Sequence, residues 1–335
     1  MRLRSIGDTV LATPALAALR RFLPQARLDV LLEDWVAPIL AGSPDVDRLL
    51  TLPRRSLIAR LRLLPALRAA RYDVAFDLHG GSTATLLTFA SGARERIGYA
   101  RYQYARLLTR RAPPSAQLWG QDALHSVEEQ LALLGSVGVP VSDRPATRVP
   151  LAPAAVESMT ARLKADGLAP DSPMALLHPM AAFESKRWSL EGFAAVAAQL
   201  HGRGLAVVAL VAPREQGTLA RLRAAAGVPV TGCADLSLPE VAALAARARV
   251  FVGNDSGIAH IAAAVRAPVV VIFGSSNVTH WRPWSTAPAE VVRQAVPCAP
   301  CPGYTCREPR PFGCIKGVSV EQVLGAIGRV LAERQ

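Results

Sequence analysis

Residues 249–260 read RVFVGNDSGIAH, and this stretch decides the fold. Its first part, Arg249–Gly253, is a continuous apolar run that predicts a buried β-strand, and Gly257–Ala264 has the spacing of a helix. The strand ends in Gly-Asn-Asp, and Ser-Gly opens the helix. A second buried strand is predicted directly afterwards at Pro268–Phe273 (PVVVIF). The stretch therefore predicts two parallel strands joined by a helix.

The same alternation of strand and helix continues along the chain in both directions. Further continuous apolar runs predict the buried strands Arg27–Glu33, Asp73–Leu78, Met174–His178 and Leu205–Val211. Segments of helical period predict the helices Thr9–Phe22, Gln121–Val137, Ala154–Asp166, Leu190–Gly202 and Arg214–Ala226. This order indicates an α/β protein with parallel sheets and helices on both faces.

The best domain boundary is Pro140–Pro153, which holds four prolines and a cluster of charges. We therefore expect two doubly wound domains, residues 1–150 and residues 151–335. The last helical segment, Ser319–Glu333, is expected to cross back onto the first domain. Only Met1–Arg4 precedes the first turn, so either the first strand is very short or the natural chain starts further upstream.

The composition is basic, with a formal net charge of +12. Residues 1–150 carry 20 Arg and 13 acidic residues, and much of this excess lies in two runs, Arg54–Arg71 and Arg94–Arg111. Such runs are usually a solvated face, but they also fit an acceptor rich in phosphate and carboxylate, or anionic lipid headgroups. The chain has neither a helix-turn-helix signature nor an aromatic stacking pattern, so no nucleic-acid partner is expected.

The sequence contains no apolar stretch long enough to span a bilayer, and its start does not have the form of a signal peptide. A cytoplasmic protein is therefore predicted, and its five cysteines are not expected to form a disulfide framework. There is also no G-x-G-x-x-G fingerprint and no Walker A motif, which argues against NAD enzymes and P-loop NTPases.

The first candidate functional residue is Asp8, in the turn Ser5-Ile6-Gly7-Asp8 that opens the first helix. In a doubly wound fold, ligands gather at the carboxyl ends of strands, where a carboxylate can accept a proton from a sugar hydroxyl. The alternative is that Asp8 only caps the helix, which Asp does well.

The second and third candidates follow two strands of the second half. Lys186 lies in the segment His178–Trp188, where backbone N–H groups and a lysine suit a diphosphate, although a solvated loop packed on Trp188 is equally consistent. In the stretch that decides the fold, Ser256 and the free N–H groups of the helix form an anion site that His260 can reach. The alternative there is Asp255 as the N-cap and His260 as a core residue.

A fourth candidate is the Cys-rich loop at 298–314, which contains Cys298, Cys301, Cys306 and Cys314. Thiolates at this spacing suit a structural zinc ion, or less readily an iron–sulfur cluster, and the alternative is four free thiols. Two other segments are ambiguous or misleading. Asp45-Val46-Asp47 has the form of a metal–nucleotide motif but reads as a turn, and His79–Ser82 either lines a cleft or makes a tight turn.

Together these segments resemble the heptosyltransferases of glycosyltransferase family 9, and the resemblance covers nearly the whole chain. Its most specific parts are the Gly-Asp…Thr-Pro-Ala-Leu start, the His-Pro…Lys-Arg-Trp segment and Asn-Asp-Ser-Gly-Ile-Ala-His. The resemblance implies a GT-B fold, in which two Rossmann-like domains face a cleft. It places the acceptor on the N-terminal domain and an ADP-heptose donor on the C-terminal one, with inversion at the anomeric carbon and no catalytic metal.

The resemblance also assigns roles to single residues. It implies that Asp8 is the general base and that Lys186 binds the donor diphosphate. Glu215 would bind the ribose, and the phosphate and sugar would be held by Asp255, Ser256, Gly257 and His260. Ala181 and Ala182 stand where family members often have Thr or Ser, so phosphate contacts there would come from the backbone.

The expected activity is transfer of heptose from ADP-heptose to the inner core of lipopolysaccharide, either lipid A–Kdo or an already heptosylated core. The enzyme would work peripherally on the inner face of the cytoplasmic membrane. Two alternatives remain open at this point. One is a family-9-like transferase for another nucleotide sugar or acceptor, and the other is a catalytically inactive homologue that binds a nucleotide or a metal.

Overall fold

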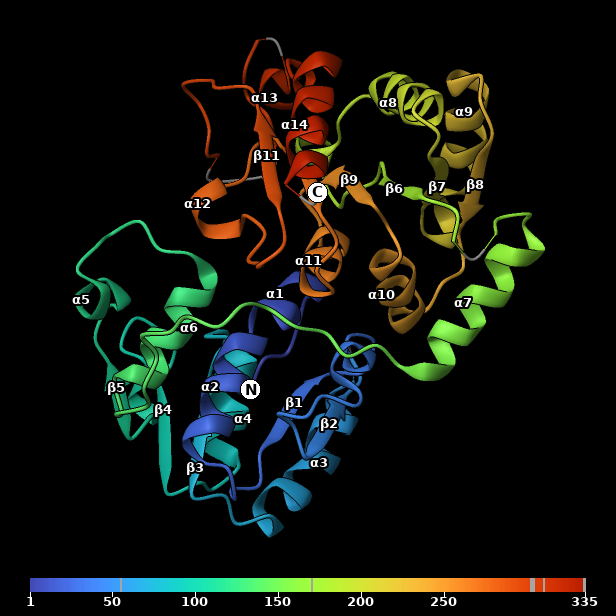
Figure 1. The fold of residues 1–335 in the computed structure, drawn as a ribbon. Coiled ribbons are helices and arrows are strands. Elements are labelled where there is room, and N and C mark those ends of the chain that lie inside the picture. Colours follow the sequence, from blue (N-terminus) through green and yellow to red (C-terminus); the bar gives the residue numbers. More distant parts are fainter. Residues whose placement is uncertain (55, 170, 302–304, 310, 334–335) are drawn as a thin grey trace. The chain divides into compact units, whose positions relative to one another are not determined.

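The computed structural model describes residues 1–54, 56–169, 171–301, 305–309 and 311–333 (Figure 1). The remaining residues lie outside this description. They include Arg55 of the first arginine run and positions 302–304 and 310 of the Cys-rich loop. The chain divides into two compact units, Met1–Pro150 and Leu151–Gln335. Each unit has its own parallel sheet and its own apolar core.

The second unit is built on a six-stranded sheet in the order β11-β10-β9-β6-β7-β8, with every neighbouring pair parallel. Its strands are β6 (Met174–His178), β7 (Ala206–Leu210), β8 (Val230–Cys233), β9 (Val250–Asn254), β10 (Val269–Phe273) and β11 (Ala289–Arg293). β6 and β9 adjoin at the centre and are buried along their whole length. The strand order reverses between them, and in such sheets the ligand crevice lies outside the carboxyl ends at this reversal point.

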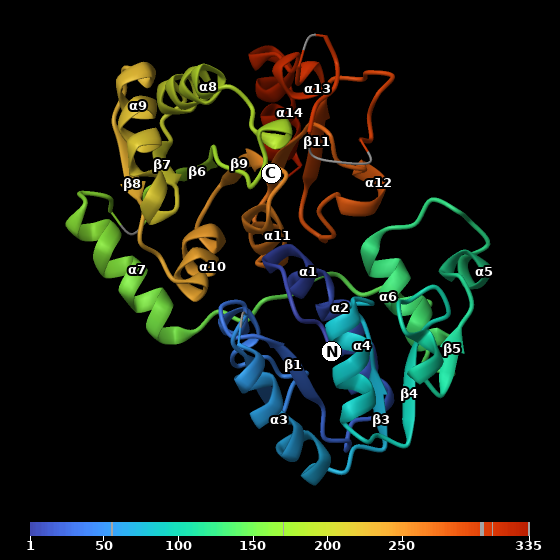
Figure 2. The ribbon, with the colours of Figure 1, turned by 180° about the vertical axis from the view of Figure 1, so that it is seen from behind.

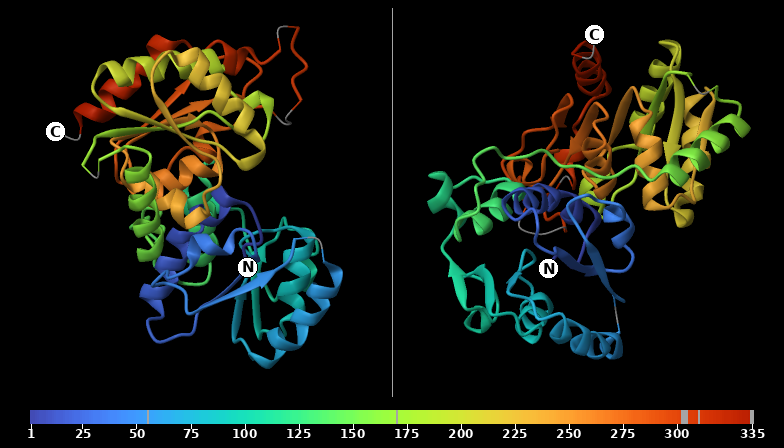
Figure 3. Two further views of the ribbon diagram at one scale, coloured as in Figure 1. Left: turned by 90° about the vertical axis from the view of Figure 1, so that its right-hand side faces the viewer. Right: turned by 60° about the horizontal axis from the view of Figure 1, so that its bottom comes forward.

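Helices cover both faces of this sheet, as Figure 3 shows. α8, α9 and α14 pack together on one face, and α7, α10 and α11 pack together on the other. The bounds are α7 (Pro153–Ala165), α8 (Leu190–Gly202), α9 (Gln216–Ala226), α10 (Leu238–Ala246), α11 (Gly257–Ala264) and α14 (Val320–Ala332), with the short helices α12 (Val278–Trp281) and α13 (Gly313–Lys316) between the last two.

The expectation that Ser319–Glu333 crosses back onto the first domain is wrong. α14 packs on α8 and on the strands β9, β10 and β11 of the second unit. The physical reason is its apolar stripe, since Val323, Ala326, Ile327 and Val330 recur at helical spacing and are fully buried in the core of that unit.

The first unit contains two parallel sheets, β1-β2 and β3-β4-β5. The strands are β1 (Asp29–Glu33), β2 (Arg48–Leu52), β3 (Val74–Phe76), β4 (Glu95–Tyr99) and β5 (Arg110–Ala112). Met1–Leu3 lies between β1 and β3. The Arg2 N–H donates to the Leu31 carbonyl (3.0 Å) on one side, and the Met1 carbonyl accepts from the Leu78 N–H (3.0 Å) on the other. This segment therefore joins the two sheets into one layer.

An apolar cavity of about 530 Å³ lies beside this segment. Val30 and Ala75, from β1 and β3, line it, together with Leu19 and Leu67 from two helices of the first unit. The backbone of Met1–Leu3 bonds to β1 at Leu31 and Glu33, and on the other side to Phe76 of β3 and to Leu78 beyond it. The cavity thus occupies the space beside the amino ends of both strands.

The helices of the first unit are α1 (Ile6–Leu11), α2 (Thr13–Phe22), α3 (Leu57–Ala69), α4 (Ser82–Ala90), α5 (Ser115–Trp119) and α6 (Ser126–Gly135). The single helix expected at Thr9–Phe22 is part of two helices that meet at Ala12, because Pro14 has no N–H and favours the first turn of a new helix. The helix expected from Gln121 begins instead at Ser126, where the His125 side chain caps it.

α3 continues through Pro65 without a break, although a proline usually interrupts a helix: the segment Arg54–Arg71 is expected from the sequence to form a helix broken near this residue. α3 contacts α4, and Leu67 and Leu87 of the two helices are buried in one apolar cluster (Figure 2). None of the helices in the described ranges combines the length and the apolarity needed to cross a bilayer.

Candidate active site

Asp8 lies in the first turn of α1, with its side chain 21% exposed. One carboxylate oxygen accepts from the Ser5 hydroxyl (2.9 Å) and the Ser5 N–H (3.3 Å), which is the geometry of a capping box. The other oxygen forms an ion pair with Arg2. Asp8 therefore does cap the helix, and its partly exposed carboxylate is also held in one orientation at the carboxyl end of the first strand.

Arg2 is a site residue that sequence reasoning missed. Its guanidinium also donates to the Leu78 carbonyl at the end of β3 (2.6 Å), so it ties the Asp8 carboxylate to a neighbouring strand. Arg2 is only 11% exposed, so this contact is largely shielded from solvent. The signal available in the sequence was an arginine between Met1 and Leu3, six residues before Asp8.

A polar cavity of about 280 Å³ lies at the same edge of the first unit, lined among others by Arg4, Arg54 and His79 and by the first turn of α4. The buried Asp77 carboxylate accepts the His79 and Gly80 N–H groups (3.0 and 2.9 Å), so His79–Ser82 makes a tight turn and also lines a cavity. Burial, and then the charge of Arg2, lower the pKa of His79. The tight turn is thus confirmed, and a place in the cleft of the fold stays a prediction.

In the second unit, the loop after β6 and the loop after β9 meet through an ion pair. Lys186 Nζ lies 2.8 Å from a carboxylate oxygen of Asp255, and the two side chains are 16% and 5% exposed. These residues are 69 positions apart in the sequence and come together because β6 and β9 are neighbours in the sheet. Asp255 is therefore the partner of Lys186, and the alternative that it is the N-cap of α11 is wrong.

The N-cap of α11 is Ser256, but its side chain makes no capping hydrogen bond. The Ser256 hydroxyl is buried and has no hydrogen-bond partner within the described part of the chain. A buried polar group normally has a partner, so an unused hydroxyl beside the first N–H groups of a helix suggests a ligand with acceptor oxygens. Gly257 begins this helix, and His260 lies on its first turn, 5% exposed.

Asn254 holds the two loops in register and was given no role from the sequence. It is fully buried, accepts from the Trp188 N–H (3.0 Å) and donates to the Pro179 carbonyl (2.9 Å). The third loop, after β10, joins through Ser275, whose hydroxyl lies 2.9 Å from that of Ser185. Lys186 is thus positioned by a network that spans the ends of three adjacent strands.

Glu215 follows β7 and is 13% exposed at its side chain. One oxygen accepts from the Ala212 N–H (3.0 Å), which closes the turn at η4 (Pro213–Glu215). The structure thus shows Glu215 stabilising its own turn, and its binding of a ribose stays a prediction.

His178 ends β6 and is a structural residue in a buried setting. Its Nδ1 lies 2.9 Å from the Leu210 carbonyl, so it donates from the neutral ring. Burial lowers the pKa of His178 below its ordinary value of 6.5. Acid therefore protonates this side chain in the unfolded chain before it does so in the folded protein.

The sign of the resulting pH dependence follows directly: because the unfolded state binds the extra proton, the free energy of unfolding falls as the pH drops below about 6.5. Stability should therefore fall between about pH 7.5 and 5.5. His178→Gln keeps a donor for Leu210 but does not titrate, so urea denaturation should show a smaller loss of stability over this range for the variant. An equal loss in both proteins would contradict this assignment.

The cysteines Cys298, Cys301, Cys306 and Cys314 line one cavity of about 490 Å³, and all are free thiols. The cavity also reaches Ser185 and Ser275 of the network around Lys186. Within the described ranges, no three side chains of His, Cys, Asp or Glu are arranged to hold a metal ion. The four thiols therefore line one cavity, but the structure does not show a zinc site.

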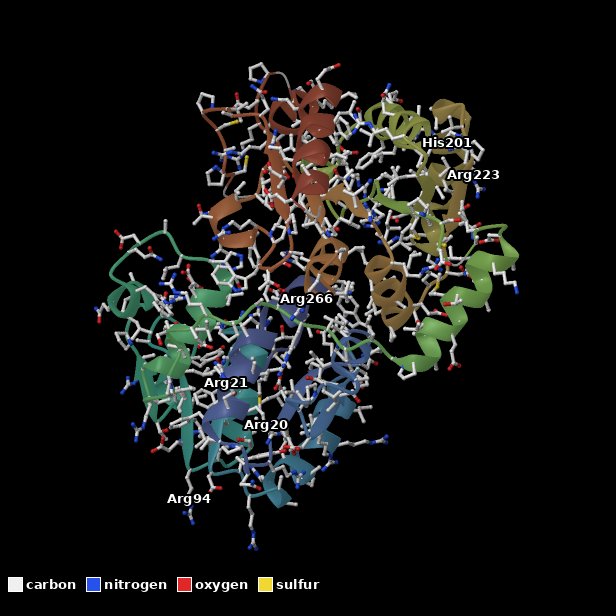
Figure 4. All side chains as sticks on the ribbon, viewed as in Figure 1. Arg20, Arg21, Arg94, His201, Arg223 and Arg266 are labelled. Carbon is white, nitrogen blue, oxygen red and sulfur yellow. The ribbon has the colours of Figure 1, made fainter. Side chains whose placement is uncertain are left out.

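The Asp45–Asp47 segment is a turn, as expected. The Asp45 carboxylate pairs with Arg148, and that of Asp47 accepts from Arg20 and from the Leu28 N–H (2.7 Å). Both carboxylates are thus engaged in structural contacts. Figure 4 shows Arg20 and Arg21 projecting from α2.

Comparison with known proteins decides the family. The model of glycosyltransferase family 9 (heptosyltransferase) matches residues 60–311. Lipopolysaccharide heptosyltransferase 3 of Escherichia coli is 30% identical over 293 residues, which covers 84% of this chain and 85% of the relative. The chain belongs to glycosyltransferase family 9. It is thereby a glycosyltransferase, as its sequence indicated.

Solved structures of family 9 share the fold. A family 9 glycosyltransferase from Veillonella parvula superposes with a TM-score of 0.84 at 18% identity, covering 99% of this chain and 95% of the other. The E. coli ADP-heptose lipopolysaccharide heptosyltransferase II superposes with a TM-score of 0.78 at 22% identity, covering 98% and 96%. The expected α/β class and GT-B fold are confirmed.

Proposed function

We propose that this family 9 glycosyltransferase moves heptose from ADP-heptose to the inner core of lipopolysaccharide, with inversion at the anomeric carbon. The relatives carry this activity in their names: E. coli heptosyltransferase 3 acts on lipopolysaccharide, and the E. coli structure is an ADP-heptose enzyme. The acceptor is either lipid A–Kdo or a core that already carries heptose. No catalytic metal takes part in the proposal.

The donor side of the proposal rests on one observation, the buried Ser256 hydroxyl without a partner at the start of α11. The helix N–H groups and the Lys186 ammonium provide positive potential there, while Asp255 holds the lysine in place. A diphosphate would supply the missing acceptor oxygens. We assign Lys186 and the α11 start to the ADP phosphates, Glu215 to the ribose, and His260 to the phosphate–sugar region.

Ser256→Ala should act in opposite directions on stability and on binding. In the free protein it removes an unsatisfied buried hydroxyl, so the melting temperature should be unchanged or higher. ADP binding should weaken by about 1 kcal/mol, roughly fivefold, because a hydrogen bond to phosphate is lost. Calorimetric titration with ADP and a thermal melt check the two signs. A variant that melts earlier and binds ADP normally would show that the hydroxyl is only structural.

The acceptor side of the proposal uses Asp8. Its carboxylate would take the proton from the acceptor hydroxyl as the C–O bond to the anomeric carbon forms, and ADP would leave with the bonding electron pair. Nearby, the polar cavity offers the guanidiniums of Arg4 and of Arg54, which also pairs with Glu33, for an anionic acceptor. Phosphate and carboxylate groups pair well with arginine.

Mass spectrometry of the acceptor tests the substrate assignment. Kdo₂–lipid A and a heptosylated core are each incubated with ADP-heptose and, in parallel, with other nucleotide sugars. The proposal predicts one added heptose on one of these acceptors and no product from the other donors. Transfer of a different sugar would establish the first alternative, and nucleotide binding without any transfer would establish an inactive homologue.

We also propose that Cys298, Cys301, Cys306 and Cys314 bind one structural metal ion. Four soft sulfur ligands suit zinc, and binding would require the loop to draw the thiols closer together than they lie here. Elemental analysis of the purified protein should find about one zinc or iron per chain. Cys298→Ser with Cys301→Ser should abolish it. Metal-free protein with four reactive thiols would refute this part.

The proposal finally places the enzyme peripherally on the inner face of the cytoplasmic membrane. A lipid-linked acceptor is held there, and no helix of the described residues could anchor the protein by crossing the bilayer. The two arginine runs of the first unit supply the charge for an anionic surface.

A further inference from the structure

The outer face of α3 and α4 exposes large apolar side chains. Ile58 and Leu61 of α3 are 63% and 57% exposed, and Leu86 and Phe89 of α4 are 47% and 48% exposed. The spacing of three residues places each pair on one side of its helix. The two helices adjoin, and the Arg68 side chain of α3 donates to the Ala90 carbonyl at the end of α4 (3.2 Å). The four residues therefore belong to one face of the first unit.

These helices are apolar on their inner side as well. Leu67 of α3 and Ala84 and Leu87 of α4 are 1%, 0% and 5% exposed and form part of the core. A surface helix normally carries charged or polar residues opposite its core stripe. Here the outer side also carries apolar residues, and exposed apolar patches rimmed by polar residues usually mark an interaction site.

The charge of the chain around these two helices is mainly positive, although Asp73, just after α3, is exposed. Residues 48–121 contain 13 arginines and only three acidic residues, and neither α3 nor α4 contains an acid. Two of those acids are engaged, since Asp77 is fully buried and Glu95 pairs with Arg110 (2.8 Å). Arg62 is exposed on α3, and Arg94, just beyond α4, projects outward in Figure 4. The Arg96 guanidinium lies 5.6 Å from the ring of Phe89.

We propose that this α3–α4 face is the surface by which the protein docks on an anionic lipid bilayer. Apolar side chains would enter the boundary between headgroups and acyl chains, and the surrounding guanidiniums would contact lipid phosphates. A second copy of the chain fits this face poorly, because it would bring two arginine-rich surfaces together. The inference rests on the proposed function only in that a lipid-linked acceptor gives the docking a purpose.

Vesicle co-sedimentation tests the surface directly. The full chain should pellet with vesicles of phosphatidylcholine and phosphatidylglycerol, remain in solution with phosphatidylcholine alone, and be released by high salt. Leu61→Glu with Phe89→Glu should lower binding to the anionic vesicles at least about tenfold. Arg62→Gln with Arg94→Gln should weaken binding and reduce its dependence on salt.

The matched control is Leu151→Glu with Val156→Glu, which adds the same two charges at apolar positions of the second unit that are 44% and 39% exposed. It should bind vesicles like the unmodified chain, and all variants should melt at the same temperature. A second assay compares a soluble oligosaccharide acceptor with the same acceptor on a lipid in vesicles. Leu61→Glu with Phe89→Glu should lose activity only on the vesicles.

Three outcomes would overturn the inference. The unmodified chain could fail to pellet with anionic vesicles, the glutamate variants could pellet as well as the control, or the face could instead mediate a dimer that these variants dissociate. Failure of the proposed function would look different, because transfer to the soluble acceptor would then be absent in every protein while vesicle binding persisted.

Discussion

Replacing Asp8 by alanine should lower kcat at least about 100-fold, or roughly 3 kcal/mol in the barrier, because a positioned general base contributes that much or more. Asp8→Asn should lower kcat to a similar extent. The amide oxygen can still accept from Ser5 and Arg2, so the fold of α1 and its cap should survive. Steady-state rates with saturating donor and acceptor provide the measurement, and a variant with near-normal turnover would exclude Asp8 as the base.

Ser5→Ala separates capping from catalysis. It removes the hydroxyl that donates to the Asp8 carboxylate (2.9 Å) at the start of α1, but leaves that carboxylate and its pair with Arg2 in place. Loss of such a hydrogen bond costs about 1 kcal/mol of stability, so the variant should melt earlier. Its kcat should fall by much less than that of Asp8→Asn. Equal losses in both variants would mean that Asp8 acts only by capping the helix.

Replacing Lys186 by alanine should give the second large effect, on both activity and stability. It removes the proposed partner of the diphosphate, and loss of one such electrostatic contact typically costs about 10²–10³ in kcat. It also leaves the Asp255 carboxylate, 5% exposed, without its lysine. Breaking a buried pair in this way destabilises a protein by about 3–5 kcal/mol. Rates and urea denaturation of the same preparation measure the two losses.

The double variant, Lys186→Ala with Asp255→Ala, tells the two roles of the lysine apart. Without the carboxylate no buried charge is left alone, so much of the stability should return. Activity should not return, because the contact with the diphosphate is still missing. Recovery of activity along with stability would show that Lys186 serves only as the partner of Asp255.

The buried strands of the second unit could be predicted from the sequence to within about one residue. β6, β9 and β10 are parallel strands covered on both faces, so they form unbroken apolar runs with little ambiguity. β2, β4, β5, β8 and β11 were missed. The sequences of β4, β5 and β8, ERIGY, RRA and VTGC, show neither a run nor an alternation. Their pairing depends on neighbouring strands, which a local pattern does not contain.

The candidate site was also predictable only in part. The motifs that carry Asp8, Lys186 and Ser256 could be found from strand ends and helix starts. The ion pair between Lys186 and Asp255 could not, because it arises from the adjacency of β6 and β9. Arg2 was missed for a similar reason, since its role comes from the place of the first strand beside β3. The spacing of the cysteines predicted that they lie together in one loop, but it could not predict how their sulfur atoms are arranged.

The most direct test of the central claim is ADP release from ADP-heptose by the purified protein, with and without Kdo₂–lipid A or a heptosylated core, beside Asp8→Asn. The account predicts release that depends on one of these acceptors and falls at least about 100-fold in the variant. Release that is absent with both acceptors, or that is equal in the two proteins, would contradict it.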